Sequence, residues 1–342
     1  MADLSQIASS TRDSIGRYFS LVSALPSAVL VAWTVLLVGS GAWTGTPDIA
    51  AALRAFTEIG IGGAAGLVLA SIAVGVVLHP MQFAFVQFLE GYWGASPVAR
   101  QARFLRIAAH WRRVHGLRAE ATSIGIRIDD LKARQSAATG VEYQQLMAEI
   151  AELRSAQREL VRLTSTYPDT LDAFMPTRLG NVLRHYEWTV GEGYGIAAIY
   201  AVPYLARVSG SGDMEYVNDQ RSQLDLSVRM TVVSFLASAF AVLFLARHGL
   251  WLLIVLVPYA ASYLSYRGAV VAAAEYGRAL GVLVTLNRFA LYQRLELNRP
   301  QDTAAERLQN ADLTHFLRHG DTTGLSLSYR PQAEPPAGGT TA

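Results

Sequence analysis

Four long apolar stretches constrain this chain more than any other feature. They are 21–43, 59–82, 230–246 and 250–266. A helix of about 20 apolar residues covers the hydrocarbon core of a bilayer, which is ~30 Å thick. The sequence therefore predicts an all-α integral membrane protein. Two transmembrane helical hairpins, at 21–91 and 227–267, enclose a long charged segment at 92–226.

The prediction of two hairpins requires that the first stretch is a retained span and that the third and fourth stretches are separate helices. The first stretch is longer than the ~7–15 apolar residues of a signal peptide, and we interpret it as an uncleaved span. Only Arg247, His248 and Gly249 separate the third and fourth stretches, which predicts a tight helical hairpin with Gly249 in its turn. Pro258 lies inside the fourth stretch, where a proline is expected to kink the helix.

The composition excludes some chemistry and hints at a source. The chain has no cysteine, which excludes disulfides, thiolate nucleophiles and cysteine-ligated metals. Lys132 is the only lysine among 29 basic side chains. This arginine bias, together with abundant alanine and glycine, indicates a bacterial genome of high GC content.

Basic residues beside the apolar stretches predict their orientation. Arginines crowd 100–118, after the second stretch, and Arg267 and Arg278 follow the fourth. The connections at 44–57 and 247–249 carry one arginine each. The positive-inside rule then predicts a multi-pass protein of the cell membrane with both termini in the cytoplasm. The predicted cytoplasmic parts are 1–20, 92–226, 268–319 and the tail 320–342.

The charged middle has the pattern of long helices. Apolar residues recur at helical spacing along 100–165, with a small-residue break at 135–140. This pattern predicts an antiparallel helical hairpin. A coiled coil with a partner chain is the alternative, because part of the stripe keeps a heptad register. Gln157 interrupts that stripe with a polar side chain.

Five arginines at the start of this segment are candidates for contact with anionic lipid headgroups. They are Arg100, Arg103, Arg106, Arg112 and Arg113. Each basic residue near a membrane surface adds about 1 kcal/mol of attraction. Nucleic-acid phosphates attract the same charge. The cluster leaves a membrane span directly and lacks an array of stacking aromatics, so lipid is favoured and no nucleic acid is expected.

Residues 171–208 are the most distinctive stretch. Four polar residues within helical reach of one another form a candidate polar or ligand cluster, and a structural network of salt bridges and caps is the alternative. They are Arg178, Asn181, Arg184 and Glu187. The apolar run 196–206 contains Pro203 and is too short to span a bilayer. It suits an interfacial or re-entrant helix, so 171–208 is predicted to be an interfacial segment.

The element Met-Pro-Thr-Arg-Leu-Gly-Asn-Val-Leu-Arg at 175–184, followed by Glu187 and Tyr194-Gly195, carries a resemblance. It resembles an element of uncharacterised actinobacterial membrane proteins. The likeness runs from about residue 172 to 297 and includes Ser265-Tyr266-Arg267. The resemblance implies a multi-pass architecture and a bacterial source. It carries no established activity and therefore transfers no site.

Small residues in the second apolar stretch are candidates for helix packing, because they let helices approach closely in lipid. They are Gly62, Gly66, Ala70 and Gly75. His79 is the one ionisable group close to the interior of a span. A titratable group at that depth is a functional candidate. The alternative is a histidine that simply meets the membrane interface.

The end of the chain continues with helices at 268–319. Thr303 and Glu306 have the spacing of a capping box, which predicts the start of a short helix there. Residues 320–342 are rich in Pro, Gly and Thr and are expected to be disordered.

The sequence contains no phosphate-binding loop, nucleophile elbow or metalloprotease motif, and we expect no cofactor or metal. The leading hypothesis is a non-enzymatic membrane protein whose cytoplasmic helices bind a partner or scaffold an assembly. A homo-oligomeric channel or transporter is the second, since the order of elements resembles that of bestrophin-type anion channels. A membrane-edge enzyme acting on lipid or envelope substrates is the third, with His79, His185 and Glu187 as candidate residues.

Overall fold

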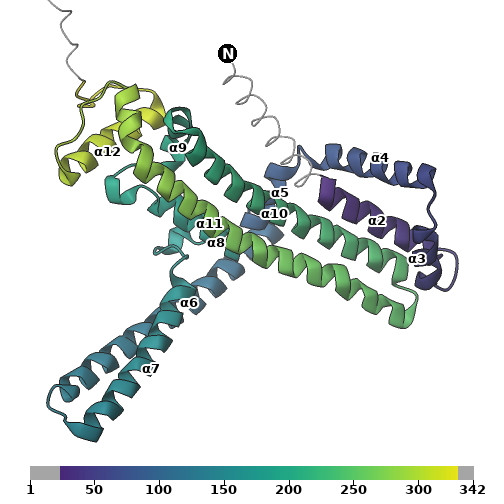
Figure 1. Cartoon of the computed structure of the whole chain (residues 1–342), viewed down its shortest axis with the longest axis horizontal. Coiled ribbons are helices and arrows are strands. Elements are labelled where there is room, and N and C mark those ends of the chain that lie inside the picture. The colour runs from purple at the N-terminus through teal and green to yellow at the C-terminus, as the bar shows by residue number, and fades with distance from the viewer. Residues whose placement is uncertain (1–23, 330–342) are drawn as a thin grey trace, which may run out of the picture. The chain divides into compact units, whose positions relative to one another are not determined.

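The computed structural model describes residues 24–329, and its regular elements in that range are all helices (Figure 1). The α-helices are α2 (Leu25–Gly39), α3 (Ile49–Thr57), α4 (Ile61–Leu78), α5 (Gln82–Glu90), α6 (Pro97–Gln135), α7 (Gly140–Thr164), α8 (Arg178–Thr189), α9 (Ala198–Val208), α10 (Ser211–Leu245), α11 (Leu256–Arg294) and α12 (Thr303–His319). The 3₁₀ helices are η2 (Leu171–Ala173), η3 (Glu192–Tyr194) and η4 (Gly249–Val255). The predicted all-α class is confirmed for the described residues.

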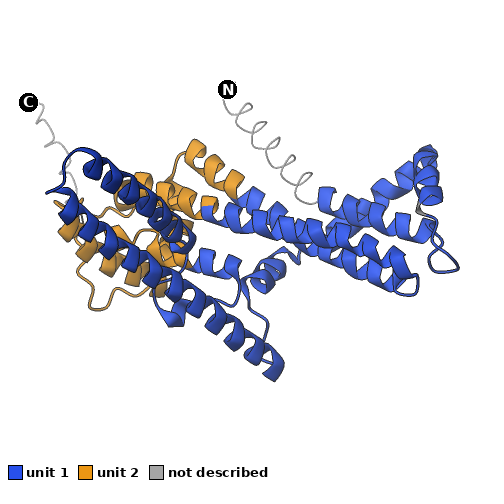
Figure 2. Ribbon diagram, turned by 90° about the horizontal axis from the view of Figure 1, so that it is seen from below, with its two compact units in different colours: residues 1–184, 221–274 blue, residues 185–220, 275–342 orange. Residues whose placement is uncertain are grey.

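The chain forms two compact units (Figure 2). Unit 1 comprises residues 1–184 and 221–274, and unit 2 comprises 185–220 and 275–342. Helices α8, α10 and α11 contribute residues to both units. Each unit is therefore assembled from two stretches that are separated in the sequence.

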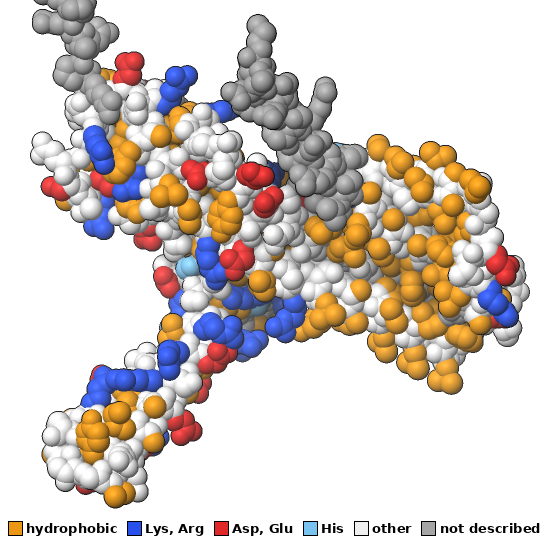
Figure 3. All heavy atoms as spheres, viewed as in Figure 1, with side chains coloured by type: hydrophobic (Ala, Val, Ile, Leu, Met, Phe, Trp, Pro, Cys, Tyr) orange, Lys and Arg blue, Asp and Glu red, His pale blue; other side chains and the backbone are white. Residues whose placement is uncertain are grey.

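Three helical segments of the described chain are long and apolar enough to cross a membrane: α4, α10 and the run from η4 through α11. Helix α2 is apolar but shorter, and the predicted first span, 21–43, begins outside the described residues. Hydrophobic side chains cover the surface of unit 1 over α2 and α4 (Figure 3). Such a surface is stable in lipid rather than in water, and it supports association with a membrane.

The apolar helices of unit 1 pack against one another. Leu37 of α2 is buried with Ala241 and Leu245 of α10. The Trp33 indole Nε1 donates a hydrogen bond to the Ala237 carbonyl, at 3.0 Å. These contacts connect α2 and α10 across a large sequence separation.

The connection between α10 and α11 turns at Gly249, which has a φ of +54° that favours glycine. Helix η4 follows, and α11 begins at Leu256. Pro258 therefore lies in the first turn of α11, where its missing N–H has no α-helical partner to lose. The fourth apolar stretch thus changes from 3₁₀ to α-helix just before Pro258, and the predicted kink stays a prediction.

Helices α6 and α7 lie side by side as an antiparallel pair (Figure 1). Buried apolar side chains from both helices form a small core, made of Ile128, Leu131, Leu146 and Ile150. The polar Gln157 is accommodated in this interface. Its Nε2 donates to the Ala121 carbonyl at 3.1 Å. A Cβ on Gly125 would lie 2.9 Å from that nitrogen, so the glycine leaves room for it.

Residues 175–181 form a tight joint with the end of α5. Thr177 Oγ1 donates to the Glu90 carbonyl at 2.9 Å. A Cβ on Gly180 would lie 2.2 Å from the same Glu90 oxygen, and a Cβ on Gly91 would lie 2.1 Å from Pro176. A side chain at either position would clash, which explains why glycine follows α5 at position 91 and stands in α8 at position 180.

Unit 2 has its own hydrophobic core, built from α9, α12 and the unit 2 part of α11. Ala201 and Leu205 of α9 are fully buried in it. The apolar run at 196–206 is thus accounted for by packing inside unit 2. Ile199 and Tyr204 of α9 remain exposed, so the expected interfacial or re-entrant position stays a prediction.

The last described residues also belong to this unit. The Asn298 N–H donates to the Ser328 carbonyl at 2.8 Å, and Leu297 pairs with Tyr329 in an isolated antiparallel bridge. Residues 326–329 therefore contact unit 2, at variance with the disorder expected for 320–342. The remainder, 330–342, lies outside the described residues.

The start of α12 also differs from the sequence expectation. Asp302 is the N-cap residue, and its carboxylate accepts from the Ala305 N–H at 2.8 Å. Glu306 instead binds Arg288, at 2.7 Å. The predicted capping box of Thr303 and Glu306 is wrong, because the ion pair takes the glutamate away from the helix start.

Candidate functional sites

Two charged side chains of α10 are buried in unit 1 against α5. Arg229 is 1 % exposed and Asp225 is 8 % exposed. The Arg229 Nε donates to Gln82 Oε1 at 3.0 Å, and the Gln82 Nε2 donates to Asp225 Oδ1 at 3.1 Å. Buried charges need such partners, because transfer of a charged group out of water costs roughly several kcal/mol. Gln82 therefore links the two charges.

Sequence reasoning missed this network. Gln82 lies far from the two charges in sequence, so the contact could not be inferred from spacing. One signal was present: Asp225 and Arg229 are four residues apart, directly before the apolar stretch 230–246. Charged groups so placed face a neighbouring helix more often than lipid.

A second cluster lies in the first half of α6, around residues 106–113, which we call the base of α6. The segment after α7 packs on it. The Arg178 guanidinium carbon lies 3.9 Å from the Tyr167 ring centroid. Its Nη1 donates to the Thr166 carbonyl at 3.1 Å. The Trp111 and Phe174 rings meet edge to face, with centroids 5.1 Å apart. Arg178 is thus held by stacking and hydrogen bonding at once.

His110 of α6 belongs to the same cluster. Its Nδ1 lies 3.2 Å from the Tyr167 hydroxyl. Burial lowers the pKa of His110 from 6.5 to about 4, and the positive charges of Arg106, Arg178 and Arg113 act in the same direction. Burial also lowers the pKa of Arg178. The imidazole is therefore neutral at physiological pH.

The five arginines proposed for lipid contact all lie on the first half of α6. Arg106 Nε donates to the Pro176 carbonyl at 3.4 Å, and Arg112 Nε donates to the Ala108 carbonyl at 3.3 Å. Arg103 is half-buried, whereas the other four are exposed. None of the five forms an ion pair with a carboxylate of the described chain.

The four residues of the predicted polar cluster of α8 lie in different surroundings. Arg178 turns to Thr166 and Tyr167, as described above. Asn181 is fully buried, and its Nδ2 donates to the Met175 and Thr177 carbonyls, at 2.7 Å each. Arg184 Nη2 donates to the Tyr92 hydroxyl at 3.0 Å. Glu187 is exposed and belongs to unit 2. Asn181 and Arg184 share a neighbour, since the Arg184 Nη2 also donates to Met175 Sδ at 3.8 Å, whereas Arg178 is bound to Thr166 and Tyr167.

Of the four small residues of α4 predicted to pack, three are exposed in the described chain and one is buried. Gly62, Gly66 and Ala70 are exposed, and a Cβ on either glycine would meet no atom within 4 Å. Gly75 is buried. The close-packed small residues lie on α10 instead and include Ser234, Ala237, Ser238 and Ala241. His79 ends α4 and is exposed.

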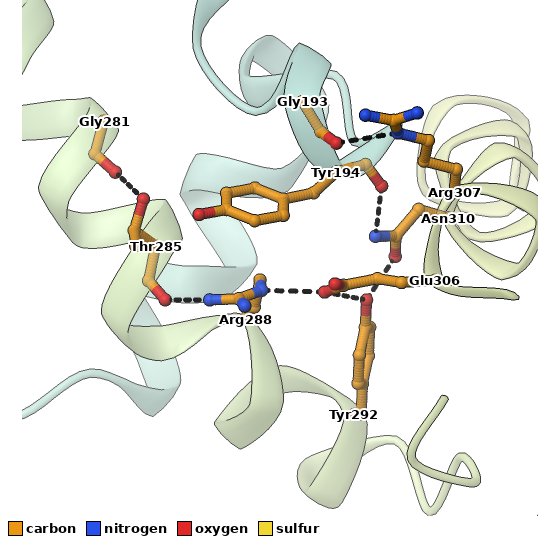
Figure 4. Close-up of polar contacts among 9 residues, drawn as sticks. All are labelled: Gly193, Tyr194, Gly281, Thr285, Arg288, Tyr292, Glu306, Arg307 and Asn310. Atoms are coloured by element: carbon orange, nitrogen blue, oxygen red, sulfur yellow. Dashed lines mark hydrogen bonds and ion pairs between the residues drawn. The ribbon is translucent and has the colours of Figure 1, made fainter. Parts of the chain in front are cut away.

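Unit 2 contains a polar network that sequence reasoning missed (Figure 4). Glu306 and Asn310 of α12 are buried. Glu306 accepts from Arg288 Nε at 2.7 Å, and Asn310 Oδ1 accepts from the Tyr292 hydroxyl at 2.6 Å. The Asn310 Nδ2 donates to the Tyr194 carbonyl at 2.8 Å. The network fastens α12 to α11 and to η3.

An open, mostly apolar groove of about 600 Å³ lies beside this network in unit 2. The end of α8 and η3 form one wall, with Tyr186 and Tyr194, and α11 forms the other. The close approach of the walls requires glycine, since a Cβ on Gly277 would lie 2.1 Å from the Tyr186 ring. Within residues 24–329, no group of three or more His, Asp or Glu side chains is placed to hold a metal ion.

No family model, curated protein or solved structure matches this chain. The resemblance of residues 172–297 to actinobacterial membrane proteins therefore stays a prediction.

Proposed function

We propose that this chain is a four-span membrane protein that acts as a membrane-anchored interaction or scaffold protein. In this proposal the spans are the two apolar hairpins, and both termini and residues 92–226 face the cytoplasm. The α6–α7 hairpin binds a partner protein, and the protein works through binding rather than catalysis.

The observation that carries this proposal is the apolar surface near the connection of α6 and α7. Large hydrophobic side chains are exposed there although the hairpin has its own buried core. They are Ile126 (69 %), Val141 (71 %), Tyr143 (43 %) and Met147 (50 %). Large apolar side chains that stay exposed on a charged helical hairpin are typical of a protein-binding site. They support a partner that covers this end of the hairpin.

Two further observations support the proposed topology. The His248 Nε2 lies 2.7 Å from the Ala42 carbonyl, so the connection after α2 and the turn between α10 and η4 are in contact. Both connections therefore lie at one end of the apolar helices of unit 1. They carry few arginines, whereas the arginines of α6 are numerous, which agrees with the positive-inside rule.

Site-specific photo-crosslinking in native membranes tests the binding proposal. A photoreactive amino acid replaces Val141 or Met147 in the full-length chain, and Arg154 of α7, also exposed, is the matched control position. We expect a discrete adduct with one protein from positions 141 and 147 and none from 154. Equal labelling from all three positions, or no adduct at all, would overturn the proposal.

A homo-oligomeric channel is the second candidate, favoured by the unused small-residue face of α4. Gly62, Gly66 and Ala70 present this face to the surroundings. Because the chain has no cysteine, a Gly66→Cys variant can report contact between two copies by disulfide formation. Val68→Cys, on the opposite face of α4, is the control. Selective crosslinking at 66 together with conductance in planar bilayers would favour the channel, and its absence would remove this candidate.

A further inference from the structure

Three basic residues and a histidine meet at the base of α6. Arg106, His110 and Arg113 follow one another at helical spacing and share one face of α6. The segment that leads into α8 packs on this face and brings Arg178 to it. Arg178 lies over the Tyr167 ring, and the Tyr167 hydroxyl lies 3.2 Å from His110 Nδ1. The folded chain thus gathers groups from two separate helices.

The positive charge at this place is not balanced. Asp169, one of two acids on this segment, binds Arg118 at 3.0 Å. No carboxylate of the described chain forms an ion pair with Arg106, Arg113 or Arg178. All three guanidinium groups lie close enough to His110 to lower its pKa, and Arg113 also lowers that of Arg178. Like charges held together repel one another, and a bound anion relieves that repulsion.

We infer that Arg106, Arg113 and Arg178, grouped around His110, form a binding site for a phosphate group. Guanidinium groups match phosphate oxygens because their planar N–H forks donate in pairs. Arg106 and Arg113 are exposed and can contact the oxygens directly. Arg178 is fixed by Thr166 and Tyr167 and supplies a preorganised charge.

Two sources can supply this phosphate: the headgroup of an anionic membrane lipid or free inorganic phosphate. The lipid source rests on the proposed membrane topology, because it requires the base of α6 to lie near the bilayer surface. Phosphate binding itself rests only on the geometry of the cluster. It can therefore be tested on purified protein without any partner protein.

The test is a calorimetric titration of the full-length protein in a neutral detergent. The probes are dioctanoyl phosphatidylglycerol, dioctanoyl phosphatidylcholine and inorganic phosphate. We expect saturable binding of the anionic lipid, and binding about tenfold or more weaker in Arg113→Gln, since a charge-assisted hydrogen bond is lost. Arg134→Gln removes the same charge at the far end of α6 and should bind as the natural chain does.

A second readout separates a specific site from general charge attraction. The His110 imidazole is followed by NMR, with His110→Gln to assign its signal. A bound phosphate raises the pKa of His110, because a nearby negative charge favours the imidazolium. Arg113→Gln should lose this response, whereas Arg134→Gln should keep it.

The outcomes divide clearly. Binding by inorganic phosphate alone keeps the site and assigns it to free phosphate. Equal weakening by Arg113→Gln and Arg134→Gln, no binding of any probe, or an unchanged His110 signal at saturation would overturn the inference. A failure of the photo-crosslinking experiment leaves this result untouched, so the two proposals fail independently.

Discussion

There is no space for a side chain at Gly180, where residues 175–181 pack against the end of α5. A Cβ there would lie 2.2 Å from the Glu90 carbonyl oxygen, which is backbone and cannot turn away. We expect Gly180→Ala to lower the free energy of unfolding by about 1–3 kcal/mol, as overpacking does. Thermal unfolding of the purified protein measures this loss.

The matched control is Gly116→Ala in α6. A Cβ at Gly116 would meet no atom within 4 Å. Alanine is better than glycine in a helix interior by roughly 1 kcal/mol, so this variant should be as stable as the natural chain or more so. Equal melting temperatures for the two variants would show that the tight joint at Gly180 does not exist.

His110 predicts a pH dependence of stability. Its pKa is about 4 in the folded protein against 6.5 ordinarily. Between these pH values the unfolded chain holds more protons than the folded one, so stability falls as the pH falls from 6.5 towards 4. Burial lowers this pKa most, and the charges of Arg106, Arg178 and Arg113 lower it further.

Removing the imidazole should remove this part of the acid sensitivity. We expect His110→Gln to lose less thermal stability than the natural chain between neutral pH and pH about 4, since glutamine takes up no proton. The carboxylates titrate in both proteins, so the difference between the two melting curves isolates His110. Parallel loss in both would contradict the shift.

At the scale of single elements, the fastening of α12 depends on the Arg288–Glu306 ion pair. The two side chains are 15 % and 5 % exposed. Glu306→Leu would leave a buried guanidinium without its carboxylate, at a cost of about 3–5 kcal/mol. We expect lower thermal stability and faster backbone hydrogen exchange along α12.

The double variant Arg288→Met, Glu306→Leu is the control for this pair. It replaces both charges with apolar groups, which usually costs less than removing one partner. Its α12 amides should exchange more slowly than those of Glu306→Leu. If the double variant is the less protected of the two, the pair does not hold α12.

The elements also show what periodicity can and cannot predict. Helical spacing of apolar residues identified the stretch of α6 and α7, because each helix buries a stripe against the other. It could not show that Gln157 reaches the Ala121 carbonyl beside Gly125, because that contact depends on how two helices are aligned. Nor could it predict the partner of Glu306. Local spacing predicts that Glu306 caps a helix, whereas in the fold it pairs with Arg288.

At the scale of the whole molecule, membrane topology is directly testable because the chain has no cysteine. We expect Thr46→Cys to react with a membrane-impermeant maleimide on intact cells. Ala137→Cys, in the connection of α6 and α7, should react only after lysis. Both expectations follow from the arginine distribution. The natural chain is the unlabelled control, and labelling of position 137 on intact cells would reverse the proposed orientation.

The whole molecule was less predictable than its spans. Hydropathy located the apolar helices because insertion into lipid depends on the length and apolar composition of one local stretch. The division into two units was not predicted, because each unit is made of two stretches that are separated by a stretch of the other unit. The buried Gln82–Asp225–Arg229 network and the contacts of residues 326–329 with unit 2 were missed for the same reason. Both depend on contacts between residues far apart in the chain.

The connectivity of unit 2 also determines the order in which the protein can be made. Its core joins Ala201 and Leu205 to Leu283 and Leu313, and the apolar stretches 230–246 and 250–266 lie between these partners in the sequence. Chains are synthesised from the N-terminus. Both stretches have therefore been translated, and are available to the membrane, before α9 can meet α11 and α12. During synthesis the apolar stretches 230–246 and 250–266 thus emerge first, and the core of unit 2 closes last.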